Sequence, residues 1–505
     1  MAPVNLATIL DPHPDDAPAL ISRGRTTTYG ALRDQAARLA GGLAGLGVAP
    51  GDRIGIVCAN NWYFVVSYVA TLRAGAVAVP LNPLSPPQAL QSQLAEVGAC
   101  AVVVGPSGQT ALDGVDRATL PDLEHVITTG GAPGEGLISL DDAMASEPLV
   151  LVERGDDDPA VLMFTSGTAG SPRAAILSHG NLRANIDQVL AVDEAQRVAD
   201  DVSLCVLPLF HIMGLNAILD VALRAGSTVL LMERFDPQSA AEAIGKHGVT
   251  VIAGAPAMWG AWAALPGLPP GAFAEVRLAT SGAAALPPDV ADRMRDRFGL
   301  VLTEGYGLTE AAPVVTSSLG METRPGSIGA PLDGVEVRLV DDQGDDVLVG
   351  DAGEIWVRGD NVFQGYWGDP EGECHALTAD GWLRTGDVGV VDDDGYLFLV
   401  DRAKDLIIVS GFNVFPAEVE EVVIEHPSIA DCAVVGVAHP YSGEAVKAFV
   451  VVADGGSIEE DEVIDFCAAR LPRYKCPEKV LFVDDLPHGL AGKVLKRQLR
   501  DSVAS

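Results

Sequence analysis

Residues Thr165 to Arg173 form a loop whose composition suits the binding of phosphate. The loop reads Thr-Ser-Gly-Thr-Ala-Gly-Ser-Pro-Arg and follows an apolar stretch, Val161–Phe164, that is typical of a strand. Glycine lets the backbone approach an anion closely, and hydroxyl and backbone N–H groups can then bind phosphate oxygens. No Gly-Lys-Ser/Thr follows and no helix is expected to start there, so the loop is not of the Walker type. An ordinary hairpin turn is the alternative.

Four polar residues that lie much farther along the chain, within motifs given in the next paragraph, have side chains that could contact a nucleotide. Glu310 offers a hard carboxylate oxygen that suits Mg²⁺. Asp387 can accept hydrogen bonds from both hydroxyls of a ribose, and Arg402 can donate to a ribose or a phosphate. Lys493 carries an ammonium, a cation with three hydrogen-bond donors. A solvated side chain or a surface ion pair is the alternative for each of them.

The motifs around these residues resemble those of the adenylate-forming superfamily, which includes acyl-CoA synthetases, aryl-CoA ligases, luciferases and peptide-synthetase adenylation domains. Besides the loop, the matching segments are Leu207–Gly214, Thr280–Leu286, Glu304–Glu310, Leu383–Asp387, Asp401–Asp405, Ser410–Glu418 and Gly492–Lys493. Several motifs in one order are far more specific than any one of them. The family loop has Thr, Lys and Gly where this chain has Ala169, Arg173 and Ala174.

The resemblance implies an ATP-dependent ligase with ATP, Mg²⁺ and coenzyme A as its cofactors. In this family a carboxylate attacks the α-phosphate of ATP to give an acyl adenylate and pyrophosphate, and the thiol of coenzyme A then displaces AMP. The protein must bring two anions together and neutralise the charge that develops on the phosphate. It does so mainly by positioning and electrostatics.

The same resemblance implies roles for individual residues. The expected catalytic residues are Lys493, Glu310, Thr309 and His211, and the expected metal ligands are Glu310 and Thr165. The residues expected to bind ATP or coenzyme A are Thr165, Ser166, Gly167, Thr168, Gly170, Arg173, Gly282, Ala283, Ala284, Gly305, Tyr306, Gly307, Asp387, Arg402, Lys404 and Gly411. Lys404 is also the expected hinge of a rotation that withdraws Lys493 and brings in the Gly411 loop. Arg173 keeps the charge of the family lysine but not its geometry, so its contact with the β- and γ-phosphates is open.

Two histidines have to be interpreted separately. His211 matches a position where the family often has a histidine or an aromatic residue that gates the acid or helps to close the thiol tunnel. A buried histidine with a structural role is the competing interpretation. His179 is expected to be structural.

The acid site is expected to be apolar and to lack a charged partner for an α-amino group. Its candidate lining residues are Ile212, Met213, Gly214, Leu215, Ala311, Ala312 and Pro313. The segments Ser410–Glu420 and Ser442–Lys447 look most like fatty acyl-CoA ligases, so a medium- or long-chain fatty acid is the first expectation and an aryl acid the second. A ligase that stops at the adenylate or loads a carrier protein is a further alternative. A non-catalytic nucleotide- or acyl-binding protein is the last, suggested by Arg173 and Ala174.

Composition narrows the partners and the compartment. The chain has 33 Lys and Arg against 69 Asp and Glu, a net charge of −36, which disfavours nucleic acid and anionic membranes as partners. Trp62–Leu81, the most apolar stretch, is broken by Arg73, Gly75 and Pro80, so no integral membrane association is expected. Seven scattered cysteines without a CxxC pair indicate reduced thiols in a cytoplasmic protein. The expected partners are therefore small molecules, and a homodimer is left open.

Length and pattern predict an α/β fold with more than one domain, because 505 residues exceed what one core usually supports. Thr28 is expected to cap a helix, and apolar strands are expected at 54–58, 76–80, 100–104, 202–207, 227–232 and 250–253, with helices between them. This alternation indicates parallel-sheet α/β subdomains, followed from about Gly326 by a β-rich subdomain. The resulting large N-terminal domain is placed at 1–401. A small, mobile C-terminal α+β domain is placed at 402–505, with the hinge near Lys404.

Overall fold

The chain forms two compact units. The first comprises residues 1–325, 329–336 and 357–383, and the second comprises 326–328, 337–356 and 384–505. The computed structural model describes residues 5–129, 136–165, 173–192, 197–341, 343–368, 376–402, 407–409, 412–439, 443–453, 455–471, 473–488 and 494–503. The domain boundary between 401 and 402 and the hinge at Lys404 stay predictions.

A seven-stranded sheet forms the amino-terminal half of the first unit. In order across the sheet, its strands are β7 (Ile138–Ser139), β6 (His125–Thr128), β5 (Ala101–Val104), β3 (Arg53–Val57), β4 (Val77–Pro80), β8 (Pro159–Thr165) and β9 (Arg173–Ser178). All neighbours are parallel except β8 and β9, which form an antiparallel hairpin. The helices of this half are η1 (Leu6–Leu10), α1 (Tyr29–Gly45), α2 (Trp62–Arg73), α3 (Pro87–Val97), η2 (Pro106–Gly108), α4 (Gln109–Asp113), η3 (Arg117–Thr119), α5 (Leu140–Met144) and α6 (His179–Leu190).

Local sequence signals account for these elements. The Thr28 hydroxyl accepts a hydrogen bond from the backbone N–H of Ala31 at 3.3 Å, so the predicted cap of α1 is confirmed. Strands β4 and β5 are buried along their whole length, as expected for parallel strands that are covered on both faces. Among the described residues, no helix has both the length and the apolar character needed to cross a membrane.

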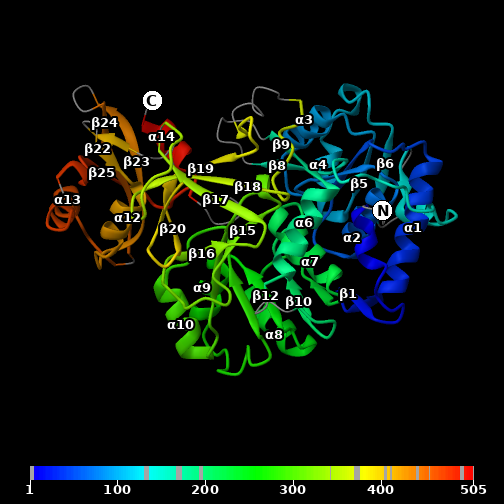
Figure 1. The fold of residues 1–505 in the computed structure, drawn as a ribbon, viewed down its shortest axis with the longest axis horizontal. Coiled ribbons are helices and arrows are strands. Elements are labelled where there is room, and N and C mark those ends of the chain that lie inside the picture. Colours follow the sequence, from blue (N-terminus) through cyan, green and yellow to red (C-terminus); the bar gives the residue numbers. More distant parts are fainter. Residues whose placement is uncertain are drawn as a thin grey trace. The chain divides into compact units, whose positions relative to one another are not determined.

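A second sheet of the first unit carries most of the candidate residues. Its strands run in the order β2 (Arg25–Thr28), β1 (Pro18–Ser22), β11 (Thr228–Leu231), β10 (Val202–Cys205), β12 (Val251–Gly254), β13 (Leu278–Ser281), β14 (Thr303–Gly307), β15 (Val314–Ser317) and β16 (Ser327–Pro331). Its helices are the π-helix η5 (Met213–Asp220), α7 (Val221–Arg224), α8 (Pro237–His247), α9 (Pro256–Ala264) and α10 (Pro288–Phe298). Figure 1 shows α8, α9 and α10 gathered beside β10 and β12. The fully buried rings of Trp259 and Trp262 anchor this core.

Antiparallel pairing already occurs before the β-rich subdomain that the sequence predicts from about Gly326. Strands β14 and β15 are antiparallel, with Tyr306 opposite Thr316. Only a short turn, which includes the 3₁₀ helix η6 (Thr309–Ala311), joins the two strands. A parallel pairing needs a crossover of a dozen or more residues, so this connection can only be antiparallel.

The second unit is smaller and rich in antiparallel strands. It contains a run of four neighbouring strands, β17 (Val335–Val340), β18 (Gly353–Gly359), β19 (Leu383–Val391) and β20 (Leu397–Arg402). Its carboxyl-terminal part is α+β, as predicted. This part consists of β21 (Ile407–Val409), β22 (Phe412–Val414), α12 (Pro416–Ile424), β23 (Ile429–His439), β24 (Gly443–Val452), α13 (Glu460–Ala468), η7 (Arg473–Lys475), β25 (Lys479–Phe482) and α14 (Lys496–Val503).

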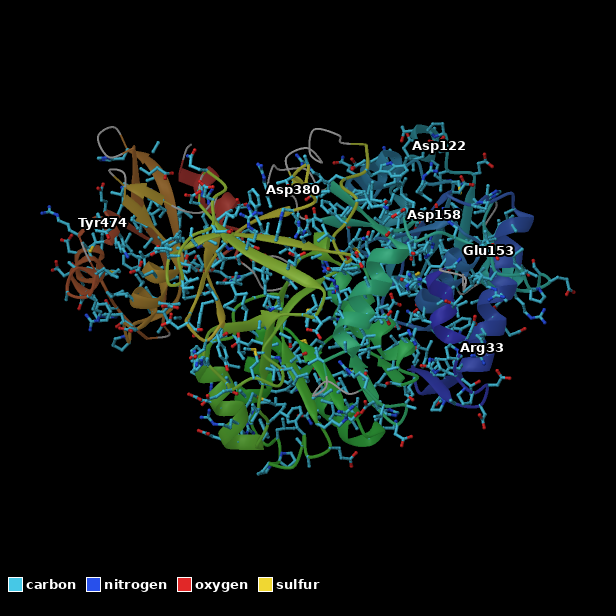
Figure 2. The ribbon with its side chains drawn as sticks, in the orientation of Figure 1. Arg33, Asp122, Glu153, Asp158, Asp380 and Tyr474 are labelled. Carbon is cyan, nitrogen blue, oxygen red and sulfur yellow. The ribbon has the colours of Figure 1, made fainter. Side chains whose placement is uncertain are left out.

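Acidic side chains lie on the outside of the first unit. Asp122 and Glu153 are exposed, and both are labelled in Figure 2 together with the partly buried Asp158. Most carboxylates of this kind need no partner, because water solvates them. The acidic composition is therefore a property of the surface, and buried carboxyl groups are exceptions that need an explanation.

Asp220, at the end of the π-helix, is such an exception. Its carboxyl is fully buried and accepts a hydrogen bond from the Tyr68 hydroxyl on α2, with 2.9 Å between the two oxygens. Burial raises the pKa of Asp220 to about 8, because water can no longer solvate the charged form. The carboxyl group therefore keeps its proton at neutral pH in the folded protein and loses it in the unfolded chain.

We predict that Asp220→Asn removes a pH dependence of stability. Because the folded pKa lies above the unfolded value, native Asp220 stabilises the fold at low pH and loses that contribution as the pH rises from about 4 to about 8. Asparagine has no charge to bury, so the variant should gain stability relative to the parent as the pH rises, at most by about 1.4 kcal/mol for each unit of pKa shift. Urea unfolding midpoints at pH 5, 6.5 and 8 measure this gain.

The exposed residue Asp122 supplies the matched control. Asp122→Asn makes the same chemical change at the surface and should shift the midpoint equally at all three pH values. A difference between Asp220→Asn and the parent that stays constant from pH 5 to pH 8 would contradict the prediction.

Candidate active site

The two strands that flank the candidate phosphate loop pair with each other and fix both ends of the loop. Thr165, the last residue of β8, and Arg173, the first of β9, are direct cross-strand partners. The Thr165 hydroxyl lies 3.4 Å from the carbonyl oxygen of Arg173 and donates to it. Ser166, Gly167, Thr168 and Gly170 lie outside the described residues. The structure thus defines the two ends of the loop and confirms the strand predicted at 161–164.

Strand β9 runs beside residues 363–367, which are distant in the sequence. The backbone N–H of Trp367 donates to the carbonyl of Ala174 at 2.8 Å, and that of Ile176 donates to Gly365 at 2.9 Å. These bonds place the ring of Tyr366 beside the side chain of Arg173. The guanidinium carbon lies 5.4 Å from the ring centroid, within the range of a cation–π contact.

Glu310 is held by the same segment. The Tyr366 hydroxyl donates to Glu310 Oε1 with 2.6 Å between the oxygens, and the backbone N–H of Phe363 donates to the Glu310 carbonyl at 2.9 Å. The Glu310 side chain is half-buried. Among the described residues, its other carboxylate oxygen, Oε2, has no hydrogen-bond partner. One oxygen is therefore bound to the protein while the second is available to a ligand.

Three buried asparagines hold the backbone that follows Glu310. Asn361 Nδ2 donates to the carbonyl of Ala311 at 2.7 Å, and Asn216 Nδ2 donates to the carbonyl of Ala312 at 2.6 Å. Asn185 makes two bonds with Val314, one to its carbonyl at 2.7 Å and one from its N–H at 3.0 Å. The three side chains are at most 1% exposed. We call these residues the asparagine clamp.

The candidate adenine-side loop lies next to β14. Ser281 at the end of β13 is opposite Glu304, and the N–H of Leu286 donates to Glu304 Oε2 at 3.3 Å. Within the loop, Gly282 is buried while Ala283 and Ala284 are exposed. Ala283 has a φ of 70°, a left-handed conformation that costs an alanine energy. Strain of this kind persists where the surroundings impose it, which is common at functional sites.

The motif Gly305–Gly307 has a packing explanation. A Cβ at Gly305 would lie 2.7 Å from the carbonyl oxygen of Thr316, and one at Gly307 would lie 2.1 Å from that of Pro313. Both glycines are therefore required by the close approach of residues 313–316. Tyr306 between them is 8% exposed, so most of its ring belongs to the core. Thr309 is half-buried in η6, and its carbonyl accepts from the N–H of Ala312 at 3.2 Å.

His211 lies two residues before the π-helix and is mostly buried. Among the described residues its Nε2 has no hydrogen-bond partner, and burial lowers the pKa of the imidazole, which favours the neutral ring. Its ring centroid lies 4.8 Å from that of Phe210. An unpaired buried nitrogen is compatible with a ligand contact and does not exclude a structural role. His179 has a clear structural role, because its Nδ1 accepts from the N–H of Leu6 at 3.0 Å.

Most of the apolar acid-site candidates are buried. Ile212 is 5% exposed, and Leu215, Ala311 and Ala312 are 0% exposed. Gly214 and Pro313 are buried as well, so of the seven candidates only Met213 is partly exposed. Met213 borders the adenine-side loop, because a Cβ at Gly282 would lie 3.0 Å from its Cε. The structure therefore places Met213, the one partly exposed candidate, next to the adenine-side loop.

The remaining candidates belong to the second unit or lie outside the described residues. Asp387 on β19 and Arg402 on β20 are direct cross-strand partners, and the Asp387 N–H donates to the Thr385 hydroxyl at 3.1 Å. Lys404, Gly411 and Lys493 lie outside the described residues.

A Mg²⁺ ion fits the donors that are present. No group of three or more histidine, cysteine or acidic side chains that could hold a metal occurs in the described part of the chain. Mg²⁺ does not need one, because it is commonly held by one or two carboxylates together with substrate phosphates and water. Glu310, whose orientation is fixed and whose second oxygen is accessible, suits that mode, and the Thr165 oxygen is a second candidate ligand.

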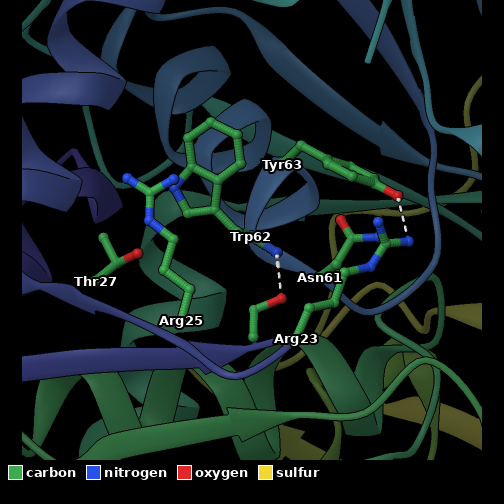
Figure 3. Close-up of a pocket in the computed structure, with 7 residues that line it drawn as sticks. Arg23, Arg25, Thr27, Asn61, Trp62 and Tyr63 are labelled. Carbon is green, nitrogen blue, oxygen red and sulfur yellow. Dashed lines mark hydrogen bonds between the residues drawn. The ribbon is translucent and has the colours of Figure 1, made fainter. Parts of the chain in front are cut away.

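A separate pocket lies between β1, β2 and the start of α2. Its lining residues are Ser22, Arg23, Arg25, Thr27, Asn61, Trp62 and Tyr63, and its volume is about 270 Å³. Figure 3 shows the Arg23 guanidinium at the Tyr63 hydroxyl, a contact of 3.4 Å. Arg23 is also paired with Glu233 at 2.6 Å, which neutralises its charge. None of the candidate residues lines this pocket.

The sequence motifs did not point to the clamp or to Tyr366. The sequence does mark two of the asparagines as unusual. Asn185 and Asn216 are polar residues within the apolar, helix-forming segments Leu182–Ile186 and Leu215–Leu219. A polar side chain among core positions is expected to be hydrogen-bonded. No comparable signal marks Asn361 or Tyr366, which lie in a turn and in an irregular segment.

Comparison with known proteins gives matches over almost the whole chain. The model of the AMP-binding enzyme family matches residues 8–367, and that of the AMP-binding enzyme C-terminal domain matches residues 418–493. A feruloyl-CoA synthase from Amycolatopsis sp is 39% identical, over 97% of this chain and 96% of its own length. A long-chain-fatty-acid–CoA ligase from Yersinia pestis is 36% identical, over 96% and 92%. The ATP-bound structure of MatB from Rhodopseudomonas palustris has a TM-score of 0.91 and 34% identity, over 99% of each chain.

We predict that the asparagine clamp stabilises the segment after Glu310. Asn216→Ala should destabilise the protein by about 1–3 kcal/mol, because the buried carbonyls of Ala312 and Leu182 lose their donor. Asn216→Asp should be worse, because a carboxylate places an acceptor against those carbonyls. Urea unfolding midpoints rank the three proteins.

Amide hydrogen exchange provides the local measurement. In Asn216→Ala the amides of Ala311 and Ala312 should exchange faster, while those of the distant strand β5 should change only as global stability does. Equal stability of Asn216→Ala and the parent, with unchanged exchange at both alanines, would show that the clamp has no such role.

Proposed function

The chain belongs to the AMP-binding enzyme family and is an AMP-forming acyl-CoA ligase, and on that premise we propose that its acid is compact and apolar, foremost an aryl acid. The observation that carries this choice is the burial of six of the seven acid-site candidates, with only Met213 partly exposed. A flat aryl acid needs a short apolar surface, whereas a long alkyl chain needs a tunnel whose walls would be exposed to solvent.

A medium- or long-chain fatty acid is the second candidate. It was the first expectation from the motifs, and the relative from Yersinia pestis, at 36% identity, carries that substrate in its name. The feruloyl-CoA synthase from Amycolatopsis sp, at 39%, favours the aryl acid. This difference in identity is small, so the burial of the acid site decides the order of the two candidates.

Adenylate formation, in this proposal, is catalysed by residues that meet the phosphates from several sides. Mg²⁺, when bound, would neutralise phosphate charge, and Glu310 and Thr165 would hold it. Arg173 and the loop beside it contact the β- and γ-phosphates, while Thr309 contacts the α-phosphate. Lys493 binds the α-phosphate and the attacking carboxylate as the new bond forms, which brings two anions into reacting distance.

Nucleotide recognition and the second half-reaction involve further residues. Tyr306 and the loop at Gly282–Ala284 contact the adenine, and Asp387 and Arg402 bind the ribose. His211 lies beside the acid and the path of the thiol. The C-terminal domain, taken as 402–505, is proposed to rotate about Lys404 so that the Gly411 loop replaces Lys493. Domain rotation of this kind is a known way to separate two chemical steps.

We predict that the protein forms thioesters from ATP, coenzyme A and an acid of the proposed class. A panel of cinnamic, benzoic, medium-chain and long-chain acids is assayed for pyrophosphate release and for loss of the free thiol. The highest kcat/KM is expected for an aryl acid. Lys493→Ala should lower the rate of pyrophosphate release by about 100-fold or more, because a preorganised charge at the reacting phosphate is lost.

Lys479→Ala is the matched control, since Lys479 is exposed at the start of β25 and has no proposed role in the reaction. It should retain the parent rate. Pyrophosphate release without thiol loss would identify a ligase that serves a carrier protein in place of coenzyme A. A preference for fatty acids would overturn the aryl assignment, and an inactive panel with Lys493→Ala equal to the parent would overturn the catalytic proposal.

A further inference from the structure

Tyr366 contacts two candidate residues that are far apart in the sequence. Its hydroxyl donates to Glu310 Oε1 at 2.6 Å, and its ring lies 5.4 Å from the guanidinium carbon of Arg173. The two contacts use different parts of the side chain, the polar tip and the aromatic face. Tyr366 therefore joins the strand that ends the phosphate loop to the carboxylate proposed as the Mg²⁺ ligand.

The backbone around Tyr366 is fixed on both sides. Gln364 donates its N–H to the carbonyl of Ile176 at 3.0 Å, and Trp367 donates to Ala174 at 2.8 Å. Tyr366 itself forms an isolated antiparallel bridge with Ala175. The Phe363 ring packs edge-on against the Tyr366 ring, with centroids 5.0 Å apart and planes at 75°. The ring thus has little freedom, and its hydroxyl is held where Glu310 needs it.

Arginine at position 173 is suited to this neighbour. A guanidinium is flat and weakly hydrated, so it can lie against an aromatic face while its N–H groups point to an anion. A lysine ammonium is a compact, strongly hydrated charge on a flexible stem and would gain less from the ring. Where the family loop has a lysine, this chain has Arg173, and the Tyr366 ring provides a surface against which an arginine packs better than a lysine.

We propose that Tyr366 is a positioning residue that fixes Glu310 and Arg173 together for the binding of the triphosphate and its metal ion. The proposal rests on the proposed function, since it needs ATP and Mg²⁺ as ligands of this site. The hydroxyl holds one oxygen of Glu310 and leaves the other for the metal ion. The ring sets the direction from which the Arg173 guanidinium reaches the phosphates.

Two single substitutions separate the two contacts. Tyr366→Phe removes the hydroxyl and keeps the ring, so it should raise the Mg²⁺ concentration needed for half-maximal ATP binding roughly tenfold, the size of one hydrogen bond to a charged group. Arg173→Lys keeps the charge and loses the stacking, so it should weaken ATP binding at saturating Mg²⁺. Isothermal titration calorimetry with ATP, without acid or coenzyme A, measures both effects independently of turnover.

A double-substitution cycle tests the coupling to the ring. Tyr366→Leu removes the aromatic face, and in that background Arg173→Lys should have a smaller effect on the ATP dissociation constant than in the parent. Tyr63→Phe is the matched control, because it removes a half-buried hydroxyl that contacts Arg23 in the separate pocket. It should leave ATP binding and its Mg²⁺ dependence unchanged.

The outcomes distinguish this inference from the proposed function. Parent protein that does not bind ATP in the presence of Mg²⁺ would overturn both. Parent protein that binds ATP, while Tyr366→Phe has an unchanged Mg²⁺ midpoint, would overturn the positioning role of the hydroxyl alone. Additive effects of Arg173→Lys and Tyr366→Leu would overturn the role of the ring. A merely structural role would lower the unfolding midpoint of Tyr366→Phe without moving the Mg²⁺ midpoint.

Discussion

The need to satisfy the buried backbone after Glu310 constrains the site more than any other feature. The chain reverses direction there between two antiparallel strands, and the carbonyls of Ala311 and Ala312 are buried outside regular strand pairing. Such groups require donors, and the asparagine clamp supplies them without introducing charge. The clamp residues come from α6, the π-helix and the turn after β18, so the position of Glu310 depends on the packing of all three.

The regular elements of the first unit were predictable because their signals are local. Helix α1 combines a capping threonine with an apolar face, and β5 is a short apolar run between helices. The clamp is different, since Asn185 and Val314 are 129 positions apart and Asn216 and Ala312 are 96 apart. No periodicity encodes a contact at that separation, so a single sequence can show that an asparagine is out of place but not what it holds.

The candidate site also has residues that the sequence could predict and residues that it could not. The resemblance to the family identified Glu310 and Arg173, because each lies inside one of the short motifs that occur in the family's order. It left open what Arg173 does, and it did not single out Tyr366, 56 positions after Glu310. A tyrosine in an irregular segment looks like an ordinary packing residue. Only the pairing of residues 363–367 with β9 shows that it faces both side chains.

These contacts also bear on how an acidic protein can bind a polyanion. A net charge of −36 repels ATP at long range, and in the proposed site Glu310 would add a negative charge close to the phosphates. The Tyr366 hydroxyl holds the Glu310 carboxylate by a short hydrogen bond, and the Tyr366 ring carries the guanidinium of Arg173 on its face. In the proposed site, a metal ion would meet a carboxylate whose orientation is already set, and the phosphates would meet an oriented cation. Local preorganisation of this kind can overcome long-range repulsion, because at contact distances fixed charges and dipoles interact far more strongly than the screened net charge does.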